Sequence, residues 1–384
     1  MFPSECLLDR RVRSDGYHQD LDDTNLPLFI LRCEDRKADG YAGDKLELYN
    51  QRLNDMVIGV RLADAPPDVS YLTILGALLS AEIVAVDKTV IVIRLAFTRE
   101  GATPSPRSYL IYDAVALSLR MIPASPQDPS WAYTISSSVS LARPCRGPDY
   151  ALVLTGRLGA GGEKSFFLWR PSSSLPPWSE CKKAALLDHN GCSETKTSMP
   201  FSFNGHIYRV DLLRGAFCSV NKISSKFRPK FCFSCDALFD DKSSSVAKFI
   251  HLPVEPGRYH QRIAEPAAYR TMGVVGDSFI RFVSIDGFHE YVELKDRTVT
   301  VWKLVGHDNG WEKEHELSLE TLWGFQGFGD LSKELTPMYP LLSTIDTDVV
   351  YLGLGNYHET KIIGGLSIST VGVLAILPAL HARR

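Results

Sequence analysis

Short runs of alternating apolar and polar residues, separated by turn residues, characterise this chain. In the clearest run, Phe201 and Phe203 alternate with smaller residues, which predicts a strand with one buried face. Asn204-Gly205 follows, and both residues tolerate the positive φ that a tight hairpin turn requires. The predicted return strand, second turn and third strand are His206–Asp211, Leu213–Gly215 and Ala216–Val220.

Weaker copies of this unit recur about every 40–60 residues, a period typical of propeller blades. In several copies the strand ends in an aspartate or arginine and is followed by a turn, as at Asp113, Arg170 and Asp211. The other predicted strands are Met56–Leu62, Glu82–Val86, Thr89–Leu95, Tyr109–Asp113, Leu117–Met121, Tyr150–Leu158, Lys164–Trp169, Lys248–His251, Arg270–Val275, Phe279–Ile285, Glu290–Leu294 and Thr298–Leu304.

The pattern predicts an all-β fold made of small antiparallel sheets. A sheet of three or four short strands cannot bury both faces alone, so neighbouring sheets must cover one another. Radial stacking gives a β-propeller-like array of about six blades, which we favour because the strand–turn signature repeats. Two packed β-sandwiches are the alternative, since they also account for many short strands.

The same pattern divides the chain into three parts. Residues 1–50 are predicted to be an irregular lead-in, residues 51–355 the propeller-like domain, and residues 356–384 an apolar tail. Pro- and Ser-rich residues predict surface loops over Pro123–Ser138 and Pro171–Trp178. Ser318–Phe325 is the one segment predicted to be helical, with Ser318 as its N-cap.

Composition and charge disfavour some classes of protein. The formal net charge is −3 and no run of Lys and Arg occurs, which disfavours nucleic acid as a partner. Eight cysteines in 384 residues are too few for a disulfide scaffold. The first residues carry charges where a secretory signal needs an apolar core. Together these features predict a cytoplasmic or nuclear protein.

Several segments, in this order, resemble a plant family known as domain of unknown function 1618, which is expanded in grasses. They are Leu7–Arg10, Val60–Ala63 with Pro66-Pro67, Tyr109–Asp113, Leu119–Pro123, Phe167–Arg170, Val210-Asp211, Tyr269–Val274, Ile280–Val283, Val299–Leu304, Trp311, Leu322-Trp323 and Pro340–Leu342. The resemblance spans roughly residues 5–355 and implies blades similar to the propellers that follow F-boxes in plant ubiquitin-ligase adaptors. It implies no established activity. After Gly355 the chain departs from the family, because a glycine-rich apolar tail replaces the expected last strands.

Four motifs resemble sites of chemistry. Cys232 and Cys235 have the spacing of half a zinc site, but no second pair completes four ligands. Gly276-Asp277-Ser278 resembles a block of GDSL esterases, yet it lies between two strands and favours a hairpin turn. In Gly156–Lys164 a glutamate precedes the lysine where a phosphate loop needs glycine. His289-Glu290 and His315-Glu316 lack the second histidine of a zinc protease. We therefore predict no catalytic, cofactor-binding or metal-binding residue and no cofactor.

Two apolar segments suggest contacts with other molecules. Trp323, Phe325 and Phe328 lie among glycines and are candidates for a partner-binding patch, because aromatic residues dominate binding hot spots. The alternative is that they pack in the core. Residues 362–380 form an apolar run close to the ~20 residues that span a bilayer, so a tail anchor and packing on the domain both remain open.

These observations favour a non-catalytic protein-interaction module. It would bind an unidentified protein partner through loops on one face of the propeller, since rigid scaffolds present variable loops. The alternatives are a hydrolase with a site at the propeller channel and a tail-anchored membrane protein held by residues 362–380. The sequence leaves the partner's identity and the oligomeric state open.

Overall fold

The structure of the protein is a computed structural model. The described residues are 7–8, 12–14, 28–61, 69–75, 78–87, 89–97, 107–124, 133–143, 150–158, 164–171, 178–181, 185–186, 199–204, 206–221, 245–254, 266–276, 278–287, 292–305, 310–324, 336–344, 347 and 349–355.

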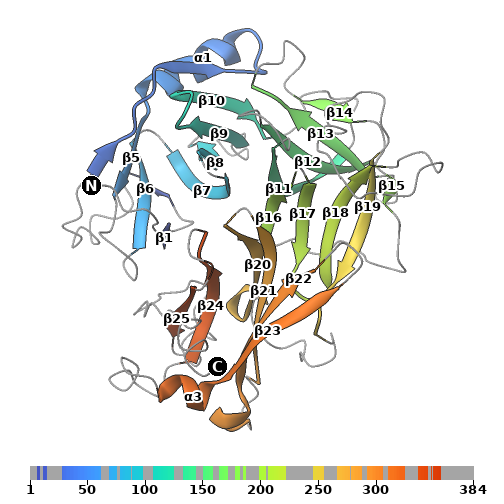
Figure 1. Ribbon diagram of the computed structural model, residues 1–384. Coiled ribbons are helices and arrows are strands. Elements are labelled where there is room, and N and C mark those ends of the chain that lie inside the picture. The colour runs from blue at the N-terminus through green and yellow to red at the C-terminus, as the bar shows by residue number, and fades with distance from the viewer. Residues whose placement is uncertain are drawn as a thin grey trace. The chain divides into compact units, whose positions relative to one another are not determined.

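The protein is all-β and consists of several small, mainly antiparallel sheets, as predicted (Figure 1). We number them in chain order. Sheet 1 contains β1 (Leu7–Leu8), β2 (Arg13–Ser14), β3 (Leu28–Ile30), β5 (Val57–Arg61) and β6 (Val69–Leu75). Sheet 2 contains β4 (Asp35–Ala38), β7 (Leu78–Asp87), β8 (Val90–Phe97), β9 (Arg107–Asp113) and β10 (Ser118–Pro123). Sheet 3 contains β11 (Tyr133–Ala142), β12 (Ala151–Leu158), β13 (Lys164–Trp169) and β14 (Ser179–Cys181).

The remaining sheets lie in the second half of the chain. Sheet 4 contains β15 (Ala185–Leu186), β16 (Met199–Phe203), β17 (His206–Asp211), β18 (Gly215–Asn221) and β19 (Ser245–His251). Sheet 5 contains β20 (Arg270–Val275), β21 (Phe279–Asp286), β22 (Thr298–Leu304) and β23 (Trp311–Ser318). Sheet 6 contains β24 (Thr336–Leu342) and β25 (Val350–Gly355).

A four-stranded meander is the repeated element. Sheets 2 to 5 each have four consecutive strands in spatial order, so every strand is next to its sequence neighbour. Sheets 1, 2 and 4 also take short extra strands in parallel. Asp35–Ala38 pairs with Ser118–Met121, Ala185-Leu186 pairs with Val246-Ala247, and β1 and β2 pair with β6. These parallel additions were not predicted.

Contact clustering divides the chain into two compact units. The first comprises Met1–Leu187, Pro200–Ile207 and Ser219–Ala247, and the second comprises Asp188–Met199, Tyr208–Cys218 and Lys248–Arg384. The division into residues 1–50, 51–355 and 356–384 stays a prediction.

In the first unit, sheet 2 is buried on both faces. One face packs with sheet 1 and a helix in an apolar cluster that includes Ile58, Leu72, Ile93, Leu110 and Met121. The other face packs with sheet 3 in a cluster that includes Val92, Ile111, Leu141, Leu152 and Trp169. The opposite face of sheet 3 contributes Val153 and Leu168 to a third cluster, which Ile207 of β17 joins. Sheets that follow one another in the chain therefore cover one another's faces.

The second unit repeats this arrangement around sheet 5. One face of sheet 5 packs with sheet 6 and α3 (Leu319–Trp323) in a cluster that includes Val283, Val301, Leu322 and Leu352. On the other face, Arg270 donates a hydrogen bond to the Leu212 carbonyl at 2.9 Å. In the second unit, therefore, the consecutive sheets 5 and 6 also cover one another's faces. The arrangement of all the sheets about a common axis stays a prediction.

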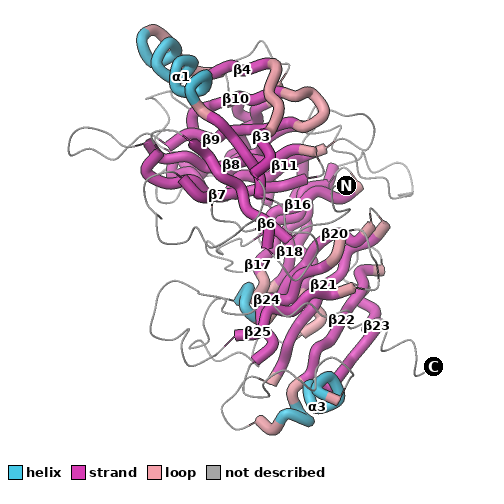
Figure 2. The backbone as a smooth tube through the Cα atoms, turned by 90° about the vertical axis from the view of Figure 1, so that its left-hand side faces the viewer, coloured by secondary structure: helices cyan, strands magenta, loops and turns pink. Residues whose placement is uncertain are grey.

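The lead-in contains a helix that the sequence analysis missed. α1 (Asp44–Asp55) lies beside β4 and β10 (Figure 2), and its buried side chains are Tyr49 and Leu53. Arg36 of β4 donates to the carbonyls of Leu53 and Met56 at 2.7 Å each, which satisfies carbonyls at the helix C-terminus. The prediction of a single helical segment was therefore wrong, because this helix depends on a contact made across the strand β4.

Most predicted strands are confirmed, and two predicted segments need correction. β11 begins at Tyr133, so the predicted loop Pro123–Ser138 ends in a strand. Leu294, predicted to end a strand, begins the 3-10 helix η4 (Leu294–Asp296), whereas η3 (Pro266–Ala268) falls where nothing was predicted. Across the described residues we find no helix with the length and apolar character to cross a membrane. Residues 362–380 lie outside the described residues.

Candidate functional site

The predicted aromatic patch is represented by one described residue. Trp323 ends α3, is 5% exposed, and packs in the apolar cluster between sheets 5 and 6. The helix begins as predicted, since the Ser318 hydroxyl accepts a hydrogen bond from the Thr321 N–H at 3.1 Å. Trp323 thus occupies the core position that the alternative interpretation expected. Phe325 and Phe328 lie outside the described residues.

The motifs that resemble sites of chemistry fall in turns, in strands or outside the described residues. The segment between β20 and β21 is a turn in which the Ser278 N–H donates to the Val275 carbonyl at 3.1 Å. His315-Glu316 lies in strand β23. Cys232, Cys235 and His289-Glu290 lie outside the described residues. In the part of the chain that the structure describes, no group of three His, Cys, Asp or Glu side chains is placed to hold a metal ion.

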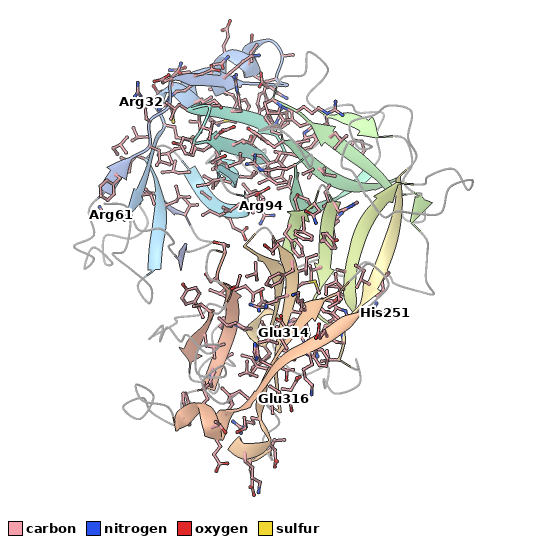
Figure 3. All side chains as sticks on the ribbon, in the orientation of Figure 1. Arg32, Arg61, Arg94, His251, Glu314 and Glu316 are labelled. Carbon is pink, nitrogen blue, oxygen red and sulfur yellow. The ribbon has the colours of Figure 1, made fainter. Side chains whose placement is uncertain are left out.

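A buried ion pair in sheet 5 was not predicted. The Arg281 Nε donates to Glu314 Oε2 at 2.6 Å, and the two side chains are 5% and 18% exposed (Figure 3 labels Glu314). The Arg281 guanidinium also donates to the Thr347 carbonyl. The pairing between β22 and β23 shifts register at Val301 and Trp302, which leaves Glu314 as the extra residue of a β-bulge. Because a bulge redirects a side chain, it lets this carboxylate reach β21. The pair links three segments and is structural.

A second polar group lies at the turn after β17. Asp211 accepts a hydrogen bond from the Leu213 N–H at 2.9 Å. Burial raises the pKa of the Asp211 carboxyl, although the backbone N–H groups of Leu213 and Arg214 and the charges of Arg214 and Arg270 act to lower it. Arg270 is 1% exposed and lies over the Phe282 ring at 5.9 Å from its centroid. This group fixes a turn against sheet 5, which is a structural role.

The turn between β9 and β10 is the candidate site that the geometry favours. Val115, at its tip, is 71% exposed, the largest fraction among the exposed large apolar side chains of the described residues. Ala114 and Ala116 on either side are exposed as well. Three consecutive exposed apolar residues are unusual at a surface unless they serve a function. We call residues 113–118 the β9–β10 turn.

The backbone of the β9–β10 turn is held at every position of its tip. Asp113 Oδ1 accepts from the N–H groups of Val115 at 2.9 Å and Ala116 at 3.1 Å. The Ala114 N–H donates to the Thr89 carbonyl at 2.9 Å. The Leu117 carbonyl accepts from the Glu34 N–H at 2.7 Å. The tip is therefore a rigid element rather than a loop that adapts to its surroundings.

Leu117 adopts a strained backbone conformation. Its φ is +47°, in the left-handed region that costs a residue with a side chain about 1–2 kcal/mol. Glycine would relieve this strain, yet leucine is present. Strain of this kind is found most often at functional sites, where the surrounding structure maintains it.

An arginine from sheet 3 fixes the neighbouring turn of sheet 2. Arg143 donates to Asp87 Oδ2 and to the Asp87 carbonyl, both at 3.0 Å, and to the Thr89 hydroxyl at 3.4 Å. Its guanidinium lies 5.8 Å from the centre of the Tyr150 ring, and burial raises the pKa of Tyr150. The Thr89 carbonyl also accepts a hydrogen bond from the Ala114 N–H. Through Thr89, Arg143 therefore links the β9–β10 turn to the end of β11 in sheet 3.

The turn between β17 and β18 is a natural comparison, because Asp211 caps it as Asp113 caps the other. Here Leu212 is 1% exposed and Leu213 is 42% exposed. Arg214 interrupts the apolar run, and Gly215 begins the next strand, β18. The aspartate that both turns share could be recognised in the sequence. The greater exposure of Val115 than of Leu213 and the backbone strain at Leu117 could not.

Comparison with family models gives one match. Residues 210–351 match the model of a family described as a protein of unknown function, DUF1618. The match covers less than half of the 384 residues, and it includes the later segments on which the resemblance was based. Neither curated proteins nor solved structures give a match. The second half of the chain is thus similar to a domain of unknown function. Plant origin and likeness to F-box-associated propellers stay predictions.

Proposed function

We propose that this protein is a non-catalytic, β-propeller-like module that binds a protein partner through turns at the ends of its sheets. The observation that carries the proposal is the stacking of consecutive sheets. Sheets 2 and 3 contribute to apolar clusters on both faces, whereas sheet 5 packs in an apolar cluster on one face and bonds the turn after β17 from the other. Once the faces are buried, the turns are the surfaces that remain for recognition, and loops on a rigid scaffold commonly carry function.

The described turns have the rigidity that such a role requires. Asp113 and Asp211 fix their turns through side-chain hydrogen bonds, and Arg143, directly after β11 of sheet 3, fixes the turn between β7 and β8 of sheet 2. A preorganised binding surface gains affinity because little conformational entropy is lost on association. The buried ion pair of Arg281 and Glu314 adds a further structural link and leaves no free charge for chemistry at that point.

The experiment is affinity capture with the intact chain, followed by titration of each captured protein after its purification. The proposal requires a saturable, reversible complex with at least one protein. A chain that captures no protein above an unrelated all-β control, in extracts of the cells that make it, would contradict the proposal. Hydrolysis of generic esters that is lost on replacement of Ser278 by alanine would favour the hydrolase alternative instead.

A further inference from the structure

We infer that α1 is a strap over the edge strand β4 and that it prevents a second copy of this chain from adding a strand to sheet 2. This role goes beyond the proposed function, since it concerns how the chain avoids self-association. Among the described strands β4 pairs with β10 alone, so it forms one edge of sheet 2. An open edge presents backbone groups that template pairing with another chain. α1 lies beside this edge strand (Figure 2).

The backbone of β4 shows where the strap meets the edge. The N–H of Asp39, directly after β4, donates to the Met121 carbonyl of β10 at 2.8 Å. Successive N–H groups of an extended chain point to opposite sides, so the Ala38 N–H points away from β10. It donates to Asn50 Oδ1 of α1 at 2.8 Å. The Asn50 carboxamide thus supplies the acceptor that the carbonyl of an added strand would supply.

Charged side chains protect the rest of this edge. Lys37 is 63% exposed and pairs with Asp39 at 2.9 Å, and Asp35 pairs with Arg120 of β10. Charges on an edge strand, lysine above all, discourage the addition of another strand. Ala38 carries no charge, so its end of β4 lacks this protection. The strap covers the position that the charges leave open.

Tertiary contacts hold the strap in place. Gly43 precedes α1 and provides no side-chain cap, which in other helices contributes about 1 kcal/mol. A helix of 12 residues is marginal by itself in water. Tyr49 and Leu53 are buried in the apolar cluster of sheets 1 and 2, and Arg36 bonds carbonyls at the C-terminus of α1. Loss of these contacts would open α1 locally and expose the edge while sheet 2 stays folded.

The test compares variants of the intact chain by hydrogen exchange and light scattering. Asn50→Ala removes the acceptor without weakening the helix, because alanine has the highest helix propensity. Asn54→Ala, at an exposed position of α1, is the matched control, and Asn50→Asp retains an oxygen acceptor. Exchange in peptides that contain Ala38 should be at least about fivefold faster in Asn50→Ala, as expected for one lost hydrogen bond, and within about twofold of wild type in the other two.

Self-association is measured on the same variants at equal concentrations. The associated fraction should exceed that of wild type for Asn50→Ala only. Adding Ala38→Pro to Asn50→Ala should return it to the wild-type level, because proline has no N–H to offer an added strand and is tolerated at a strand edge. Thermal unfolding shows which variants are folded.

The other outcomes overturn the inference. Unchanged exchange at Ala38 in a folded Asn50→Ala variant would show that Asn50 does not cap the edge. Faster exchange without more association would show that α1 is no barrier to strand addition. Association that Ala38→Pro does not reverse would place the contact elsewhere, and equal effects of Asn50→Ala and Asn54→Ala would assign them to the helix in general. If Asn50→Ala does not fold although Asn54→Ala does, Asn50 supports the whole fold and is not part of a strap.

Discussion

Replacement of Gly215 by alanine tests how tightly β18 and β19 are packed. A Cβ atom at this position would lie 2.1 Å from the Ile250 carbonyl oxygen and 2.7 Å from Phe249 Cζ. The closest of these atoms belongs to the backbone of the adjacent strand, so a side-chain rotation cannot relieve the clash. Overpacking of a core costs about 1–3 kcal/mol, and each backbone hydrogen bond lost adds about 1 kcal/mol. We expect Gly215→Ala to lower the free energy of unfolding by about 3 kcal/mol.

Gly273 is the matched control for this substitution. It also lies in a strand of the second unit, but a Cβ atom there would meet only Leu342 Cδ1, at 3.6 Å, an ordinary contact. We expect Gly273→Ala to change the free energy of unfolding by less than about 0.5 kcal/mol. Urea unfolding followed by tryptophan fluorescence gives both values, and hydrogen exchange should show the loss of protection in residues 208–218 and 248–252. A Gly215→Ala variant as stable as Gly273→Ala would refute the packing argument.

Three further changes test the turns and the buried ion pair. Leu117→Gly should raise the free energy of unfolding, measured with urea, by roughly 0.5–1 kcal/mol, because the relief of strain exceeds the entropic cost of glycine. A variant with a lower free energy of unfolding than wild type would show that Leu117 is not strained. Burial raises the pKa of the Asp211 carboxyl in the native state, so protonation of this group favours the folded protein. The resulting stabilisation is fully present below about pH 3.9, the ordinary pKa of an aspartate, and is lost as the pH rises through the raised pKa. Asp211→Asn keeps the acceptor for the Leu213 N–H, so its stability relative to wild type should increase over that window, and a constant difference would contradict this. Arg281→Met and Glu314→Gln should each lower the free energy of unfolding by about 3 kcal/mol, because each leaves a buried charge unpaired. The double variant should lose much less than the sum of the two. Strict additivity in a double-mutant cycle would rule out the coupling.

Local features of the fold were predictable from the sequence. The hairpin around Asn204 formed as its turn residues predicted, with Asn204 at φ +47°. The aspartate-capped turn after Tyr109–Asp113 and the N-cap at Ser318 are also confirmed. In each case the interacting groups are a few residues apart, so the spacing of residue types contains the information.

Features that depend on distant contacts were not predictable. The strand β4 is short and charged, and its pairing with β10 has no local signature. The sequence does not predict α1, because the contacts that stabilise this helix come from Arg36 and from the sheets against which Tyr49 and Leu53 pack. The bulge that places Glu314 beside Arg281 is equally invisible in the sequence. At the candidate site, Asp113 could be predicted from the sequence to precede a turn. The exposure of Val115 and the burial of Leu212, which occupy similar turns, could not be predicted.

The parallel pairing of β4 with β10 has a consequence for the order in which the protein is assembled during synthesis. Asp35 and Ser118 are adjacent in the finished sheet, and Arg120 pairs with Asp35 across it. A ribosome adds about 5–20 residues each second, so β4 leaves the exit tunnel several seconds before its partner exists. A shorter delay separates β15 from β19, because Ala185 and its partner Val246 are closer in the sequence than Asp35 and Ser118 are. A nascent chain stalled before Ser118 therefore lacks the strand with which β4 pairs in the finished sheet.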